Sequence, residues 1–221
     1  FNLITNSLIF SAKLKDIFSC NNKLLHETYL EKMKFLFQNN GCPEEIAALR
    51  LTIESCVKDS PLKQEILKLY TQYQTLSKGQ SAPLSSLKDT NGKNYTFADF
   101  RGKVVIVDVW ATWCCSCIEK MPKFMQLKNE FKPYKDILFL TISIHRKSNR
   151  DKWLKAIKEN NMTDMLNLIS DPTANSHFET EYHITGIPRY FIIDKEGKII
   201  TVFAPGPGKE MKTLIQNTLK R

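Results

Sequence analysis

Apolar positions repeat at helical spacing through the first part of the chain. Up to about Ser77 they recur every three or four residues, which predicts helices with one buried face. The repeating positions are Leu25, Tyr29, Met33, Leu36, Ile46, Leu49, Ile53, Cys56, Leu62, Ile66, Leu69, Tyr73 and Leu76. Ser60 and Pro61 suit the start of a helix, and Gly79 ends the run. Residues 1–79 are therefore predicted to be a small all-helical segment without a catalytic motif.

Strands alternate with helices in the rest of the chain. Val104–Trp110 and Ile137–Ile144 are continuous apolar runs with the length of buried strands. Between them, the chain from a cysteine cluster to about Phe131 has the pattern of a helix. Alternating strands and helices predict an α/β sheet that is covered on both faces. We therefore predict two domains, residues 1–79 and 80–221.

Shorter elements flank these strands. Leu84–Phe97 predicts a hairpin, because the Asn-Gly pair inside it can adopt the positive φ angles of a tight turn. Arg189–Asp194 and Lys198–Phe203 predict a second hairpin. A helix is predicted over Asp151–Asn160. A last helix carries four apolar residues on one face: Met211, Leu214, Ile215 and Leu219.

Composition is that of an ordinary globular protein, with 42% hydrophobic and 25% charged residues. The net charge of +9 raises the question of a nucleic-acid partner. The lysines are scattered with acids between them, and no basic run is interleaved with aromatics, so we expect a solvated basic surface and no nucleic acid. No apolar stretch approaches the roughly 18 residues that cross a bilayer. The first ten residues lack the basic start and cleavage site of a signal peptide.

Six cysteines fall into two groups, Cys20, Cys42 and Cys56, and Cys114, Cys115 and Cys117. If Glu44–Val57 is a helix, Cys42 and Cys56 lie about 20 Å apart. Their Cα atoms are then beyond the roughly 7 Å that a disulfide spans. Cys20 could pair with either one. The other interpretation is that all three are buried as small apolar residues.

The second group has the spacing of a redox site. A strand leads directly into Cys-x-x-Cys, so Cys114 is expected at the N-terminus of the following helix. Unpaired N–H groups and the positive end of the helix dipole favour a thiolate there. Cys117 lies one turn later on the same side and can close a disulfide. A four-cysteine zinc site would need a second pair with suitable spacing, which the sequence lacks. A structural bridge is the remaining alternative to redox chemistry.

Two parts of the sequence resemble the active-site region of thioredoxins. The run Asp108–Cys114 (DVWATWC), followed by Cys117 and Pro122, resembles the catalytic motif. Ile187 and Pro188 resemble the second hallmark of that fold, a cis-proline placed against the disulfide. The chain is thus similar to thioredoxin-like proteins at both of the segments that form their site.

Residues 80–221 resemble a narrower group, the TlpA and ResA thiol-disulfide oxidoreductases of bacteria, particularly their Bacteroidetes-like versions. The matching segments are Ala82-Pro83, Gly92-Lys93, Asp99–Lys103 and Gly186–Lys198. The resemblance implies a thioredoxin fold with an N-terminal β-hairpin and a central βα insertion, preceded here by the helical segment. The long separation of Cys117 from Pro188 leaves room for that insertion.

The resemblance also implies roles for the residues around the cysteines. Asp108 would be buried and would act as a general base for Cys117; the alternative is a carboxylate that reaches solvent. Pro188 would present the Ile187 backbone to a substrate, rather than being an ordinary loop proline. Trp113 would shield the disulfide and form part of the docking surface.

The chain departs from the family pattern at two places. Cys115 and Ser116 stand between the paired cysteines, where the family usually has a proline in the second position, so the redox potential cannot be transferred from relatives. Cys115 is either a bystander, an exchanging thiol or a ligand for a soft metal. Lys120 stands where the family tends to have a glutamate, and the acid here is Glu119.

The sequence therefore predicts an enzyme that reduces protein disulfides through a Cys114/Cys117 dithiol–disulfide cycle, with no metal or organic cofactor. Its partners would be a disulfide-containing protein substrate and an upstream thiol reductant protein. The resemblance implies a periplasmic or otherwise extracytoplasmic location, and it is compatible with a membrane tether outside the given chain. Two alternatives are a thiol peroxidase, whose Pro-x-x-x-Thr-x-x-Cys run is absent, and a non-enzymatic copper-handling module. No particular oligomeric state is predicted.

Overall fold

The structure is a computed structural model in which the chain forms two compact units, Phe1–Ser77 and Lys78–Arg221. The residues that it describes are 23–40, 50, 53–55, 57–144, 150–170 and 177–220. The predictions for Cys20, Cys42 and Cys56 lie outside these residues, as does most of the helix expected between Glu44 and Val57.

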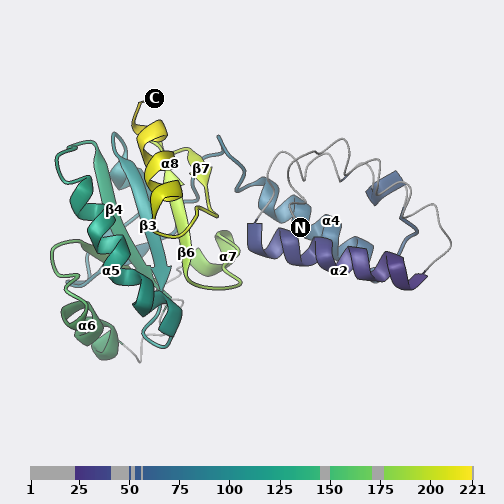
Figure 1. Cartoon of the computed structure of the whole chain (residues 1–221), viewed down its shortest axis with the longest axis horizontal. Helices are drawn as coiled ribbons and strands as arrows, with labels where there is room; N and C mark the ends of the chain where they lie inside the picture. The colour runs from purple at the N-terminus through teal and green to yellow at the C-terminus, as the bar shows by residue number, and fades with distance from the viewer. Residues whose placement is uncertain are drawn as a thin grey trace. The chain divides into compact units, whose positions relative to one another are not determined.

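The first unit contains helices α2 (Lys23–Asn40) and α4 (Pro61–Gln74), both drawn in Figure 1. Its core is formed by apolar residues of the predicted helical repeat and their neighbours, among them Leu30, Met33, Ile53, Val57, Ile66 and Tyr70. The predicted start of α4 is confirmed, because Ser60 Oγ accepts the backbone N–H of Lys63 at 3.2 Å as an N-cap. The Lys63 ammonium is buried and donates to the carbonyls of Glu54 and Val57.

The second unit is built on one mixed sheet whose strand order is β2-β1-β5-β4-β3-β6-β7. The strands β3, β4 and β5 are mutually parallel, and the remaining pairs are antiparallel. Their bounds are β1 (Leu87–Asp89), β2 (Asn94–Tyr95), β3 (Val104–Trp110), β4 (Ile137–Ser143), β5 (Leu166–Ile169), β6 (Arg189–Ile193) and β7 (Ile199–Thr201). β3 is buried along its whole length, because it lies inside the sheet with both faces covered.

Helices cover both faces of this sheet. They are η1 (Phe97–Phe100, a 3₁₀ helix), α5 (Cys115–Glu130), α6 (Arg150–Glu159), α7 (Phe178–Glu181) and α8 (Lys209–Leu219). On one face, Trp110 of β3 belongs to a core with Phe124 of α5, Trp153 of α6 and Met211 of α8. In Figure 1, α5 and α8 lie in front of the sheet on this face. On the other face, Phe191 of β6 stacks on the ring of Tyr182, which follows α7.

The observed elements follow the hydrophobic pattern closely. β3 has its predicted bounds, β4 ends one residue early, and the predicted hairpin pairs Leu87 with Tyr95. Between α5 and Pro188 the chain forms β4, α6, β5 and α7, which is one strand and one helix more than a single strand–helix passage, as expected. Periodicity did not locate β5 or α7, because each has only four residues and a four-residue run carries no clear period.

The chain just after Lys78 protects the β7 edge of the sheet. The N–H of Gly79 donates to Ile199 O at 2.8 Å, Ile199 donates to Gln80 O at 2.8 Å, and Ala82 donates to Gly197 O at 3.0 Å. These bonds satisfy backbone groups of an edge strand that would otherwise remain open to pairing with another chain.

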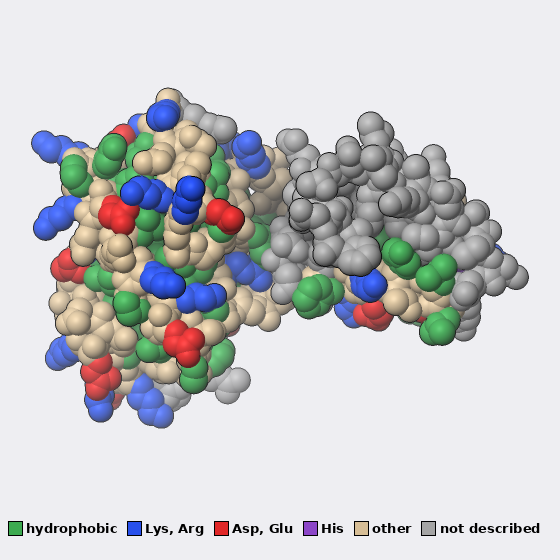
Figure 2. Space-filling view, viewed as in Figure 1, with side chains coloured by type: hydrophobic (Ala, Val, Ile, Leu, Met, Phe, Trp, Pro, Cys, Tyr) green, Lys and Arg blue, Asp and Glu red, His purple; other side chains and the backbone are tan. Residues whose placement is uncertain are grey.

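Surface charge is dispersed on the face of this unit that Figure 2 shows. Lys and Arg side chains are spread over it, with Asp and Glu between them. This distribution agrees with the solvated basic surface expected from the sequence. Within the described ranges, we find no helix with the length and apolar character to cross a bilayer.

Candidate functional site

β3 leads directly into the cysteine cluster, and α5 begins within it. Cys114 is the N-cap of α5 and forms a disulfide with Cys117, with an S–S distance of 2.11 Å and a Cα–Cα distance of 5.3 Å. The backbone N–H of Cys117 donates to Cys114 Sγ at 3.2 Å, and Ser116 Oγ lies 3.5 Å from the same sulfur. The predicted pair is thus bonded at the N-terminus of a helix.

The two cysteines differ in their access to solvent. Cys114 is 7% exposed, whereas Cys117 is 0% exposed. In the reduced protein, the helix N–H groups and the helix dipole favour negative charge on Cys114 Sγ. Cys114 is therefore the more exposed of the two cysteines and the one at the N-terminus of the helix, whereas Cys117 is fully buried.

Asp108 is buried in β3 beneath α5. Its side chain has no exposed surface, and neither carboxylate oxygen has a hydrogen-bond partner among the described residues. Burial raises the pKa of Asp108 from 3.8 to about 8, while the positive charge of Lys120 acts in the opposite direction. The expected burial is confirmed, and the carboxyl can gain or lose a proton near neutral pH.

The loop before β6 lies beside the cysteine cluster. The Ile187–Pro188 peptide bond is cis, as the resemblance implies. The register pairs Val109 with Arg189, so Pro188 lies next to the end of β3 that leads into the cluster. Ile187 packs against the buried core that contains both paired cysteines.

Three further residues near the motif face solvent. Trp113 is 64% exposed, so most of its indole is in contact with solvent. Cys115 is an exposed free thiol outside the disulfide. Lys120 is also exposed, yet its charge reaches Asp108. Trp110, in contrast, is fully buried in the core.

Residues on the strands beside Asp108 escaped sequence reasoning. Thr141 of β4 and Tyr190 of β6 each pair with Asp108 in the sheet register. The available signal was weak, since a single polar residue inside an apolar strand shows no partner until the register is known. Both are fully or almost fully buried.

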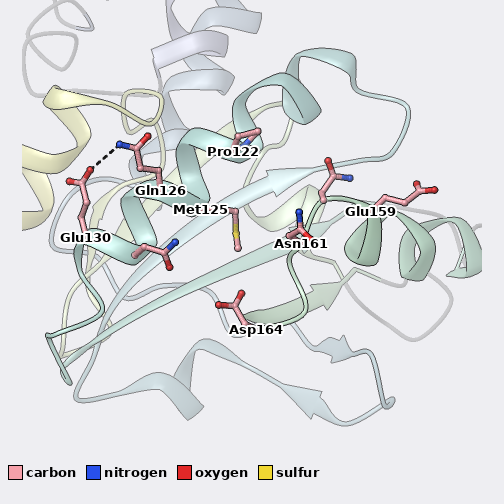
Figure 3. A pocket seen from close by; sticks show the side chains of 9 residues that line it. Pro122, Met125, Gln126, Glu130, Glu159, Asn161 and Asp164 are labelled. Carbon is pink, nitrogen blue, oxygen red and sulfur yellow. Dashed lines mark hydrogen bonds between the residues drawn. The ribbon is translucent and has the colours of Figure 1, made fainter.

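A groove elsewhere on the unit is separate from the disulfide. Its volume is about 830 Å³, and Figure 3 shows its lining side chains, which come from α5 between Pro122 and Glu130 and from the segment between Glu159 and Asp164. Each of its carboxylates has a lysine partner: Glu130 pairs with Lys212, Glu159 with Lys155, and Asp164 with Lys128. In the part of the chain that is described, no group of three or more His, Cys, Asp and Glu side chains could hold a metal ion.

Comparison with known families and proteins points to one class of protein. The redoxin family matches residues 77–216. Among curated proteins, the chain is 30% identical over 134 residues to the thioredoxin-like protein YneN of Bacillus subtilis, which covers 58% of this chain and 75% of YneN. It is 26% identical over 129 residues to the thiol-disulfide oxidoreductase ResA of the same organism, covering 58% of this chain and 68% of ResA.

Solved structures agree with the sequence comparisons. A crystal structure described as a thiol-disulfide oxidoreductase from Bacteroides vulgatus matches with a TM-score of 0.58 and 33% identity. The match covers 65% of this chain and 98% of that one. The fold prediction is confirmed by this likeness.

Proposed function

Because this chain belongs to the redoxin family and is a thiol-disulfide oxidoreductase, we propose that it works as a reductase of protein disulfides, with Cys114 as nucleophile and Cys117 as resolving thiol. The observations that carry this proposal are a disulfide at the N-terminus of a helix and a buried carboxyl group on the strand that leads into it. Cys117 of α5 and Asp108 of β3 both have no exposed surface, and the carboxyl has a pKa of about 8. A base with that pKa is suited to accept a thiol proton near neutral pH.

The reaction begins with the thiolate of Cys114. It attacks one sulfur of a substrate disulfide, so that a Cys114–substrate S–S bond forms and the substrate S–S bond breaks. The electron pair leaves on the second substrate sulfur, which takes a proton from water. The product of this step is a mixed disulfide at the N-terminus of α5.

The second step uses Cys117 and Asp108. The Cys117 S–H bond breaks as Asp108 takes the proton, and the Cys117 thiolate attacks Cys114 Sγ. The Cys114–Cys117 bond forms, and the first substrate sulfur leaves with the electron pair. The substrate disulfide is thereby reduced to two thiols while the protein pair is oxidised to the disulfide found here.

The remaining residues supply the substrate surface. Trp113 offers an exposed indole and Ile187 a partly buried backbone and side chain beside the cis-proline. Disulfide-containing substrates and a redox partner follow from the oxidoreductase class. Two further proposals rest on the resemblance to the TlpA and ResA group. The redox partner is a thiol protein that re-reduces the Cys114–Cys117 pair, and the protein works outside the cytoplasm.

The direction of the reaction is tested by the reduction potential of the Cys114–Cys117 pair, measured by equilibration of the full chain against glutathione buffers. We expect a reduction potential close to that of thioredoxin, about −270 mV, because a dithiol that reduces substrates must be less stable than its disulfide. A reduction potential close to that of strong oxidants, about −120 mV, would contradict a reductase and support an oxidase.

Cys115 is expected to take no part in the cycle. The Cα atoms of Cys114 and Cys115 are about 3.8 Å apart because the residues are adjacent in the chain, and this distance is below the normal range for a disulfide. Cys115→Ser should therefore reduce a model protein disulfide at the wild-type rate, measured under multiple turnover with excess reductant. A clear loss of rate would assign an exchange role to this exposed thiol.

A further inference from the structure

Four buried polar residues lie side by side across adjacent strands beneath α5. The register pairs Asn167 of β5 with Thr141 of β4, Thr141 with Asp108 of β3, and Asp108 with Tyr190 of β6. Paired residues on neighbouring strands point to the same face of a sheet. That face is the one covered by α5, because the ring of Tyr190 lies 6.0 Å from the ring of Phe124.

The first two members of this row have fixed hydrogen-bond directions. The Asn167 amide N–H₂ donates to the carbonyls of Met162 and Met165 at 2.8 and 2.9 Å, so its oxygen is left to accept from Thr141. Thr141 Oγ1 lies 2.9 Å from that oxygen and donates to it. A hydroxyl has one hydrogen, so Thr141 has none left to donate to Asp108.

The other two members, Asp108 and Tyr190, are a hydrogen-bond acceptor and a hydrogen-bond donor. Both carboxylate oxygens of Asp108 and the hydroxyl of Tyr190 are buried, and none has a hydrogen-bond partner among the described residues. Buried polar groups in proteins are nearly always hydrogen-bonded. Here an acceptor and a donor without partners stand on directly paired residues. Burial and the negative charge of Asp108 both raise the pKa of Tyr190, so its phenol stays protonated and remains a donor.

We propose that Tyr190 is a positioning residue for Asp108. The phenol of Tyr190 donates a hydrogen bond to the ionised carboxylate of Asp108, directly or through one buried water. This inference rests on the proposed function, in which Asp108 takes the proton of Cys117. Lys120 of α5 acts on Asp108 by its charge, and Thr141 of β4 and Tyr190 of β6 are its partners in the sheet register. Cys117 of α5 lies in the apolar core on the same face of the sheet. Tyr190 is the donor that these neighbouring strands offer, and Lys120 adds its charge from the exposed side of α5.

The hydrogen bond has a defined effect on the reaction. It stabilises the carboxylate form of Asp108, which is the form that accepts a proton, against the cost of burial. With this hydrogen bond, Asp108 can act as a base at lower pH than it could without it. Removing the phenol oxygen should leave a carboxyl that ionises only at higher pH.

Tyr190→Phe tests this directly. The full-length oxidised protein, labelled with ¹³C at aspartate side chains, is titrated by NMR, and the Asp108 signal is assigned by its absence from Asp108→Asn. We expect the Asp108 pKa to rise by about one unit in the variant, the size of one hydrogen bond to a charged group. This readout does not involve thiol exchange, so it is independent of the proposed reaction.

Tyr182→Phe is the matched control. Tyr182 is also fully buried, but it packs on Phe191 on the opposite face of the sheet, and its hydroxyl donates to Pro83 O at 2.9 Å. Its replacement should lower stability without moving the Asp108 titration. An unchanged Asp108 titration in Tyr190→Phe, or an equal shift in both variants, would overturn the proposal.

A second measurement separates the two proposals. The rate at which Cys117 resolves a mixed disulfide on Cys114 is followed against pH in the wild type and in Tyr190→Phe. We expect the pH profile of the variant to move upward by the same amount as the Asp108 pKa. If the Asp108 titration moves and the rate profile does not, Tyr190 still positions Asp108, but Asp108 is not the base for Cys117.

Discussion

Cys117→Ser should convert the protein from a catalyst into a trap that reacts once per molecule. Cys114 remains the N-cap of α5 and keeps the environment that favours its thiolate, so the first attack on a substrate disulfide proceeds. A serine hydroxyl at the fully buried position cannot displace the substrate sulfur, and the mixed disulfide persists. Non-reducing gels and mass spectrometry of the adducts, with a model protein disulfide as substrate, measure the trapping.

Two variants provide the comparison. Cys114→Ser should form no adduct through Cys117, because Cys117 is buried and is not at the N-cap of the helix. Cys115→Ser, which keeps the redox pair, should turn over normally and accumulate no adduct. Adducts that form through Cys117 in Cys114→Ser would reverse the assigned roles of nucleophile and resolving thiol.

Asp108→Asn should remove a large pH dependence of stability. The unfolded chain ionises this carboxyl near pH 3.8 and the folded protein only near pH 8. Because the unfolded state gives up the proton more readily, the free energy of unfolding falls as pH rises between these values. This loss of stability is absent below about pH 4 and amounts to about 6 kcal/mol well above pH 8. The asparagine variant has no charge to bury and should lack this slope.

Urea unfolding of the oxidised protein between pH 4 and pH 9 measures the effect. Asp136→Asn is the control, since Asp136 is partly exposed and its hydrogen bond to Lys195 lowers its pKa. Stability from a lowered pKa is lost only as pH falls into the acid range, so this control should keep the wild-type slope between pH 4 and pH 8. If Asp108→Asn keeps the slope as well, the buried carboxyl is not its source.

The same variant should slow the resolving step. Without a base, Cys117 must lose its proton to water that its burial excludes, and we expect the rate at pH 7 to fall on the order of a hundredfold. Rapid mixing of the reduced variant with a disulfide substrate separates this step from the first attack by Cys114. An unchanged resolving rate would remove Asp108 from the mechanism, while leaving its effect on stability intact.

Local sequence predicted the parts of the fold that depend on residues near one another in the chain. The apolar run Val104–Trp110 marks β3 because a strand buried on both faces has no polar side to show. Ser60 marks the start of α4 because a capping hydroxyl acts on an N–H three residues away. β5 was implied only by the family resemblance, since four residues paired to β1 and β4 are stabilised by those partners rather than by their own pattern.

The sequence by itself determined the redox pair. Cys114 and Cys117 are one helical turn apart after a buried strand, so the disulfide and its place at the N-terminus of α5 follow from local geometry. Only the tertiary structure decided the surroundings of Asp108. A carboxyl takes its pKa from burial and from the groups around it, and here those groups include Thr141 and Tyr190. Both lie far from Asp108 in the chain and beside it only through the register of the sheet.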